Sequence, residues 1–135
     1  MRAVLDTNVI ISALFWGGGP RRVVDLAASG RFQAITSPEL LAELEDVLAE
    51  DFEVPQERVE LILRDVLSWA EVAGPTEQVV LPVRDLADVK VVACAVAGRA
   101  DCIVTGDRDL LSLGEVQGIR MMTVRAFLDV GTPGV

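Results

Sequence analysis

Met1-Arg-Ala-Val-Leu-Asp-Thr-Asn-Val-Ile-Ile11 opens the chain and sets one acid between two apolar runs. The first run, Ala3 to Leu5, predicts a short buried strand that ends at Asp6. In open α/β sheets, ligands bind at the carboxyl edge of the strands. An ordinary turn aspartate does not need an apolar run on both sides. We therefore expect Asp6 to lie at a ligand-binding edge, provided that other acids reach the same place.

Short strands alternate with helices along the rest of the chain. After the first strand, further strands are expected at residues 31–37, 79–81, 102–105 and 119–123. Helices are expected at residues 9–16, 21–29, 38–50, 56–73, 89–97, 108–113 and 124–130. Such alternation is typical of a mainly parallel sheet with helices on both faces. The sequence predicts one α/β domain over residues 1–130, a three-layer α/β/α sandwich, with residues 131–135 as a frayed tail.

Composition limits the classes of function. The chain has 135 residues, is 51% hydrophobic, carries a net charge of −9 and contains no histidine. No stretch reads as a signal peptide or a membrane span, so we expect a cytoplasmic protein without a membrane partner. An acidic chain is a poor general binder of nucleic acid, because phosphate contacts normally come from Lys and Arg. Eleven of the 12 basic residues are arginines, however, and arginine is the better phosphate ligand.

The remaining reactive groups are few. Without histidine, the chemistry must use carboxylates, hydroxyls, thiols, Lys90 or a metal. Cys94 and Cys102 have no metal-type spacing and sit in apolar surroundings, so we interpret both as reduced core residues.

Four acids fall at equivalent places in this pattern. Asp6 ends the first strand, Asp88 opens the helix before a later strand, and Asp107 follows that strand. The helix that starts at the Ser37-Pro38 capping signal carries two further acids beside its apolar stripe, Glu43 and Glu45, and periodicity does not choose between them. Because parallel strands share one carboxyl edge, these side chains can converge there. Clustered carboxylates repel unless a cation neutralises them. Oxygen ligands without His or Cys favour Mg²⁺ or Mn²⁺.

Each of these acids also has a plain structural explanation. Asp88 and Asp107 suit the N-terminal caps of helices, and Glu43 alone suits a solvated helix surface. Asp109 is the weakest candidate and is expected to play a supporting or solvent-exposed part. The short polar residues at the same edge would orient carboxylates or merely cap helices; they are Thr7, Asn8, Ser37 and Thr105.

Four segments resemble the motif regions of the PIN (PilT N-terminus) nucleases. They are Leu5-Asp-Thr-Asn-Val-Ile-Ile-Ser-Ala13, Thr36-Ser-Pro-Glu-Leu-Leu-Ala-Glu-Leu44, Arg84-Asp-Leu-Ala-Asp-Val-Lys90 and Val104-Thr-Gly-Asp-Arg-Asp-Leu-Leu111. They cover nearly the whole chain in the right order, and the branch that they most resemble is described as toxin components of toxin–antitoxin pairs. The resemblance implies an α/β/α domain that cleaves RNA with Mg²⁺ or Mn²⁺, a homodimer, and a small antitoxin protein as partner.

The resemblance also assigns residues. Asp6, Glu43, Asp88 and Asp107 match the four family acids, which selects Glu43 over Glu45, and these four would be the catalytic metal ligands. Asn8 and Thr105 match frequent polar companions. Relatives often carry an acid beside the third position, where this chain has Val89. The basic residues expected to contact the RNA backbone are Arg21, Arg22, Lys90 and Arg108.

Two other functions fit parts of the pattern. Asp6-Thr-Asn8 with Lys90 and the Asp107–Asp109 pair resembles an aspartyl phosphatase of the haloacid-dehalogenase type. Against this, Asn8 stands where such enzymes have their second aspartate. The other alternative is a non-catalytic PIN-like domain that binds a protein, which the net charge and Val89 favour.

Overall fold

The computed structural model describes residues 1–74 and 86–130 of the chain. They form one six-stranded sheet with the order β3-β2-β1-β4-β6-β5. The strands are β1 (Arg2–Leu5), β2 (Gln33–Thr36), β3 (Ala70–Val72), β4 (Cys102–Val104), β5 (Glu115–Val116) and β6 (Ile119–Met122). The helices are α1 (Thr7–Phe15), α2 (Gly18–Ala28), α3 (Pro38–Asp46) with its π-helical continuation η1 (Val47–Asp51), α4 (Gln56–Trp69), α5 (Leu86–Ala97), α6 (Arg108–Ser112) and α7 (Val124–Val130). Among the described residues, no helix is both long enough and apolar enough to cross a membrane.

The opening strand is central to the sheet. β1 pairs in parallel with β2 on one side and with β4 on the other, and Val4 lies opposite both Ile35 and Ile103. β3 and β6 extend the sheet in parallel, and only the short β5 runs antiparallel. The carboxyl ends of β1, β2 and β4 therefore share one edge, as the sequence predicted.

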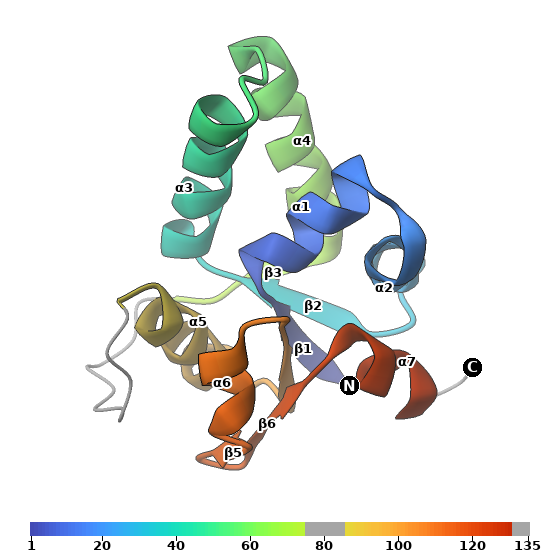
Figure 1. Ribbon diagram of the computed structural model, residues 1–135, viewed down its shortest axis with the longest axis vertical. Helices are drawn as coiled ribbons and strands as arrows, with labels where there is room; N and C mark the ends of the chain where they lie inside the picture. Colours follow the sequence, from blue (N-terminus) through green and yellow to red (C-terminus); the bar gives the residue numbers. More distant parts are fainter. Residues whose placement is uncertain (75–85, 131–135) are drawn as a thin grey trace.

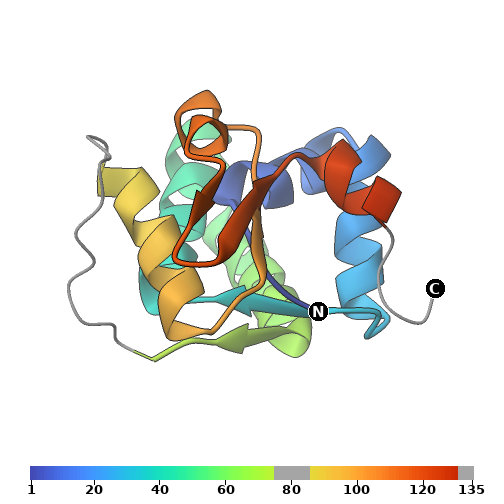
Figure 2. The same cartoon turned by 90° about the horizontal axis from the view of Figure 1, so that it is seen from below.

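Alternating strand side chains divide the core into two layers. Val4, Ile35 and Ile103 point to one face, where they pack with α5 and with Leu110 of α6. Their neighbours, including Leu5 and Val104, point to the other face and pack with α1, α2, α4 and α7. Figures 1 and 2 show α5 on one side of the sheet and α2 and α7 on the other. This is the predicted three-layer α/β/α arrangement.

Two edge strands were not predicted. The helix expected over residues 56–73 ends at Trp69, and Ala70–Val72 then pairs with β2 as β3. Three residues, of which Glu71 and Val72 are exposed, carry too little alternation to reveal a strand. β5 forms a hairpin with β6 through Gln117 and Gly118, both with positive φ, as two-residue hairpin turns require.

Other boundaries agree with the prediction to within three residues. Ser37 caps α3 by accepting the backbone N–H of Leu40 at 3.2 Å, as its position before Pro38 predicted. Cys94 and Cys102 are free and buried, and burial raises the pKa of each thiol to about 11. The strand expected at 79–81, and the tail at 131–135, lie outside the described residues.

Candidate active site

Asp6 stands where β1 gives way to α1. Its backbone N–H donates to the carbonyl of Val104 at 3.0 Å, so the β1–β4 pairing holds its main chain in place. Its side chain is only 8% exposed. The hydroxyl Oγ1 of Thr105 donates to its Oδ2 at 2.7 Å. The carboxylate is therefore held in one orientation by a neighbouring strand end.

Thr105 joins two of the predicted acids. It is completely buried, and its own N–H donates to the carbonyl of Met122 at 2.9 Å, which ties it to β6. Its hydroxyl accepts the backbone N–H of Asp107 at 3.0 Å while donating to Asp6. One side chain thus fixes both the Asp6 carboxylate and the turn that carries Asp107.

Asp107 is a helix cap. Its Oδ1 accepts the backbone N–H groups of Asp109, at 2.8 Å, and of Leu110, at 3.1 Å, at the start of α6. Both bonds use the same oxygen, so capping leaves Oδ2 outside these bonds. The capping explanation and the ligand explanation for Asp107 are therefore compatible.

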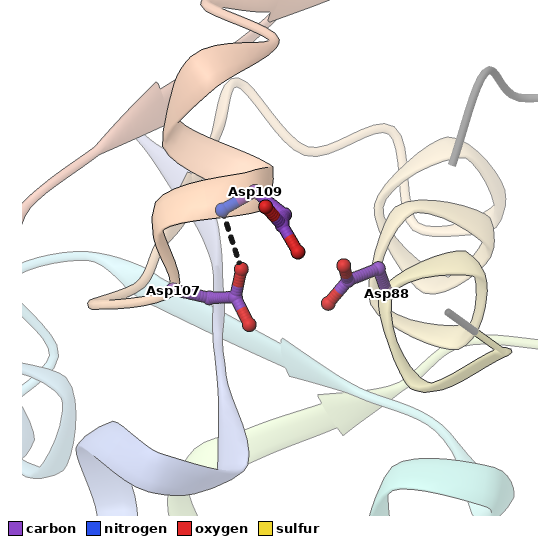
Figure 3. Close-up of side chains that lie close together, drawn as sticks. All are labelled: Asp88, Asp107 and Asp109. Carbon is purple, nitrogen blue, oxygen red and sulfur yellow. Dashed lines mark hydrogen bonds between the residues drawn. The ribbon is translucent and has the colours of Figure 1, made fainter. Parts of the chain in front are cut away.

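Three carboxylates gather at this edge. Asp88, Asp107 and Asp109 each place an oxygen so that all three lie within 4.8 Å of one another (Figure 3). Asp88 is buried and is the third residue of α5, so it is not the N-terminal cap of that helix. Asp109, expected to play a supporting part, lies within this group. The sequence feature that indicates this position is that Asp109 lies two residues after the helix-capping Asp107. The cap bonds the backbone N–H of Asp109 to the Asp107 carboxylate and so keeps the two residues close together.

The electrostatics of Asp6 reflect this neighbourhood. Burial is the largest effect and raises the pKa of its carboxyl, and the negative charge of Asp107 raises it further. The Thr105 hydroxyl and the backbone N–H groups of Thr7 and Asn8 act in the opposite direction, because they stabilise the ionised form. The net shift is upward. Ionisation of the Asp6 carboxyl therefore costs more free energy than ionisation of an exposed aspartate, and a bound cation would reduce this cost.

Glu43 lies on α3, beside the two helices that begin near the other acids. α3 contacts both α1 and α5, and the Oε2 atom of Glu43 is buried. Among the described residues, the group of carboxylates within 4.8 Å includes neither Glu43 nor Asp6. The structure therefore brings Asp88, Asp107 and Asp109 together, with Asp6 linked to Asp107 through Thr105.

The candidate RNA-contacting residues are exposed. Lys90 and Arg108 follow Asp88 and Asp107 closely in the chain, while Arg21 and Arg22 lie on α2. The side chain of Arg21 forms an ion pair with Asp25 at 3.1 Å. Asn8 is exposed at the start of α1, whereas Thr7 is buried.

A family model described as PIN domain matches residues 2–109. The chain belongs to the PIN domain family. PIN domains are typically metal-dependent nucleases, and this one carries an acidic cluster at the expected edge. Membership excludes the haloacid-dehalogenase alternative, whose motif assignment of Asp6, Asn8 and Lys90 is therefore wrong.

Solved structures show the same fold. A chain of the VapBC2 complex from Rickettsia felis, bound to a DNA fragment from their promoter, superposes on this PIN domain with a TM-score of 0.65. The two chains are 16% identical, and the match covers 91% of this chain and 98% of the other. No curated protein matches this chain.

Proposed function

We propose that this PIN domain is a divalent-metal-dependent endoribonuclease and the toxin of a toxin–antitoxin pair. The carboxylate cluster of Asp88, Asp107 and Asp109, with buried Asp6 beside it, carries the proposal. Family membership supports nuclease activity, and the fold shared with a chain of the VapBC2 toxin–antitoxin complex supports the toxin role.

The side chains present suit a hard divalent cation. All the candidate ligands are carboxylate oxygens, which Mg²⁺ and Mn²⁺ prefer. Asp6, Glu43, Asp88 and Asp107 would be the catalytic ligands, and the closeness of the Asp109 carboxylate to Asp88 and Asp107 supports adding it to this set. A cation held here would neutralise charge on the scissile phosphate and make water a better nucleophile, in a site that contains no histidine.

The protein's own groups prepare this site. Thr105 fixes the orientation of the Asp6 carboxylate, and the two N–H groups at the start of α6 fix that of Asp107. Rigid ligands lose little entropy when a cation binds. Asn8 is exposed beside Asp6 and available to a polar substrate group.

The substrate is an RNA strand held near these acids by basic side chains. Exposed Lys90 and Arg108 would contact its phosphates beside the carboxylates, and Arg21 and Arg22 would contact the backbone farther away. The protein partners are a second copy of the chain, giving a homodimer, and a small antitoxin that blocks the site.

RNA cleavage with Mn²⁺ and with EDTA tests the metal mechanism. We expect cleavage with Mn²⁺ and none with EDTA. Replacing Asp6 with Asn should reduce the rate roughly 100-fold or more, because a charged ligand is lost. The matched control is Asp46→Asn, which changes an exposed acid on α3 and should cleave like the wild type.

A second pair of variants tests the choice between neighbouring acids on α3. Glu43→Gln should reduce cleavage strongly, and Glu45→Gln should leave it nearly unchanged. Full cleavage by Asp6→Asn, or by the protein in EDTA, would contradict the metal mechanism. Absence of both cleavage and Mn²⁺ binding in the wild type would instead favour the non-catalytic PIN-like domain.

A further inference from the structure

A pocket lies at the amino end of the sheet, where β1 and β2 begin. It has a volume of about 480 Å³ and lies between Arg2, residues 30–33, and the end of α4 at Ser68 and Trp69. The label N marks this end of β1 in Figure 2. The four residues of β1 span about 13 Å and separate the pocket from Asp6, so it is distinct from the carboxylate cluster. A pocket of this size suits a small organic ligand.

The charge of this pocket is opposite to that of the whole chain. The chain has 21 acids and 12 bases, yet the described residues that line the pocket include two arginines and no acid. The guanidinium of Arg2 is engaged by Glu71 and by the carbonyl of Gly98. Arg31 is exposed at the pocket, so its guanidinium is the cation that an entering anion would meet. The pocket therefore favours an anionic ligand.

Trp69 and Gln33 add an aromatic ring and a fixed polar group to the lining. The amide Nε2 of Gln33 donates to the backbone carbonyls of Ala34, at 2.9 Å, and of Trp69, at 3.4 Å. These bonds fix the amide and leave its Oε1 outside them, as an acceptor. The Nε1–H of Trp69 is buried and has no hydrogen-bond partner among the described residues. Buried indole N–H groups usually have an acceptor, so Trp69 carries an unsatisfied donor as well as a flat ring.

We propose that this pocket binds a nucleoside monophosphate, either free or at the end of an RNA strand. A nucleotide carries three features that match the lining: an anionic phosphate for Arg31, a flat base for Trp69, and base N–H groups for the Oε1 atom of Gln33. A sugar phosphate lacks the base, and a neutral aromatic compound lacks the anion. Each of these would therefore use only part of the pocket.

Nucleotide binding at this pocket does not depend on the proposed nuclease activity. None of the described residues that line the pocket is a proposed metal ligand. Binding therefore needs no divalent cation and is measured with EDTA present, which keeps metal-dependent binding at the carboxylate cluster out of the signal.

Tryptophan fluorescence tests the pocket directly. The chain has two tryptophans, so Trp16→Phe leaves Trp69 as the single tryptophan and changes a side chain that is 70% exposed. Adding AMP, GMP, CMP or UMP to this full-length variant should quench the Trp69 fluorescence, with saturation and a Kd below about 1 mM for at least one of the four. Ribose 5-phosphate should compete at least about 10-fold more weakly, because it lacks the base.

Charge reversal at Arg31 tests the phosphate contact. In the same background, Arg31→Glu should weaken nucleotide binding at least about 10-fold, because it replaces an attractive charge with a repulsive one. Arg31→Gln, which only removes the charge, should weaken binding less. The matched control is Arg125→Glu, which makes the same reversal at an exposed arginine of α7 outside the pocket and should leave the Kd unchanged. Circular dichroism checks that the variants are folded.

A short RNA that ends in a 5′ phosphate distinguishes the two sources of the nucleotide. Binding at least about 10-fold tighter than the mononucleotide, and weakened by Arg31→Glu, would assign the pocket to a strand end. Equal or weaker binding of the RNA would assign it to a free nucleotide. The proposal would be overturned by the absence of saturable quenching, by ribose 5-phosphate that binds as tightly as the nucleotides, or by equal weakening in Arg31→Glu and Arg125→Glu. Each of these results stands whatever the outcome of the cleavage assay.

Discussion

The two ends of β1 differ in how charged side chains are arranged around them. At its amino end, the Arg2 side chain forms an ion pair with Glu71 of β3 and donates to the carbonyl of Gly98. The backbone N–H of Arg2 donates to Asp101 Oδ2 at 2.8 Å. Arg2 thus contacts both Glu71 and Asp101, so that a base lies between two acids and three segments are joined.

At the carboxyl end of the same strand, acid faces acid. Asp6 lies near Asp107, and Asp107 lies within 4.8 Å of Asp88 and Asp109. The sign of the pKa shift differs accordingly. Arg2 lowers the pKa of Glu71, whereas burial and Asp107 raise that of Asp6. Glu71, which is paired with a base, joins parts of the fold, whereas the acids that we propose as cation ligands lie close to one another.

Among substitutions at the two ends of β1, Thr105→Val at the carboxyl end is expected to have the largest effect on stability and on Mn²⁺ binding. The change removes a buried hydroxyl, so the Asp6 Oδ2 atom and the Asp107 N–H lose the bonds of 2.7 and 3.0 Å. We expect a loss of about 1–3 kcal/mol in the free energy of unfolding. We also expect Mn²⁺ affinity to fall about 10–100-fold, as when a group that orients a ligand is removed.

Urea unfolding and Mn²⁺ calorimetry measure the two effects of Thr105→Val. Thr105→Ser is the control, because it keeps the hydroxyl and should retain most of the affinity. Wild-type Mn²⁺ affinity in Thr105→Val would show that Thr105 fills the core without orienting Asp6.

A smaller effect is expected when one charge of the cluster is removed. Asn caps a helix about as well as Asp, so Asp107→Asn should leave the metal-free protein as stable as the wild type, or more stable, since one repulsion is gone. Its stabilisation by Mn²⁺ should shrink by about 1.4 kcal/mol for each tenfold loss of affinity.

The variant Asp109→Asn tests how much Asp109 contributes to Mn²⁺ binding by the cluster. Asp109 lies in the cluster but is exposed. The stabilisation by Mn²⁺ should therefore fall less in Asp109→Asn than in Asp107→Asn. Thermal unfolding with EDTA and with Mn²⁺ gives both values, with Asp46→Asn as the control. A larger loss in Asp109→Asn would reverse the roles of these two acids.

The smallest effect is expected at the amino end of β1, where Arg2 is paired with Glu71. Glu71→Gln removes the exposed partner of Arg2, and exposed ion pairs contribute little to stability. Because Arg2 lowers the pKa of Glu71, the contribution is present at neutral pH and is lost as the pH falls below the ordinary glutamate value of 4.5. Melting temperatures of wild type and variant should differ slightly at pH 7 and converge in acid. A difference that grows in acid would contradict the pairing.

The sequence alone determined the parts of the protein that follow from local patterns. Ala3–Leu5 ending at Asp6 predicted the central strand, and Ser37-Pro38 predicted the start of α3, because apolar runs and capping residues act through their chain neighbours. The order of strands and helices then predicted a parallel sheet between two helical layers. The same reasoning placed Asp6, Asp88 and Asp107 at one edge, since parallel strands align their carboxyl ends.

Tertiary structure alone determined which side chains meet at that edge. The addition of Asp109 depends on how Asp107 caps α6, and the Thr105 bridge depends on the pairing of β1 with β4, which brings residues 99 positions apart into contact. β3 likewise pairs with β2, a partner more than 30 residues earlier in the chain, and its Glu71 forms an ion pair with Arg2 of β1. Contacts of this kind join distant parts of the chain, so no local pattern of apolar or capping residues encodes them.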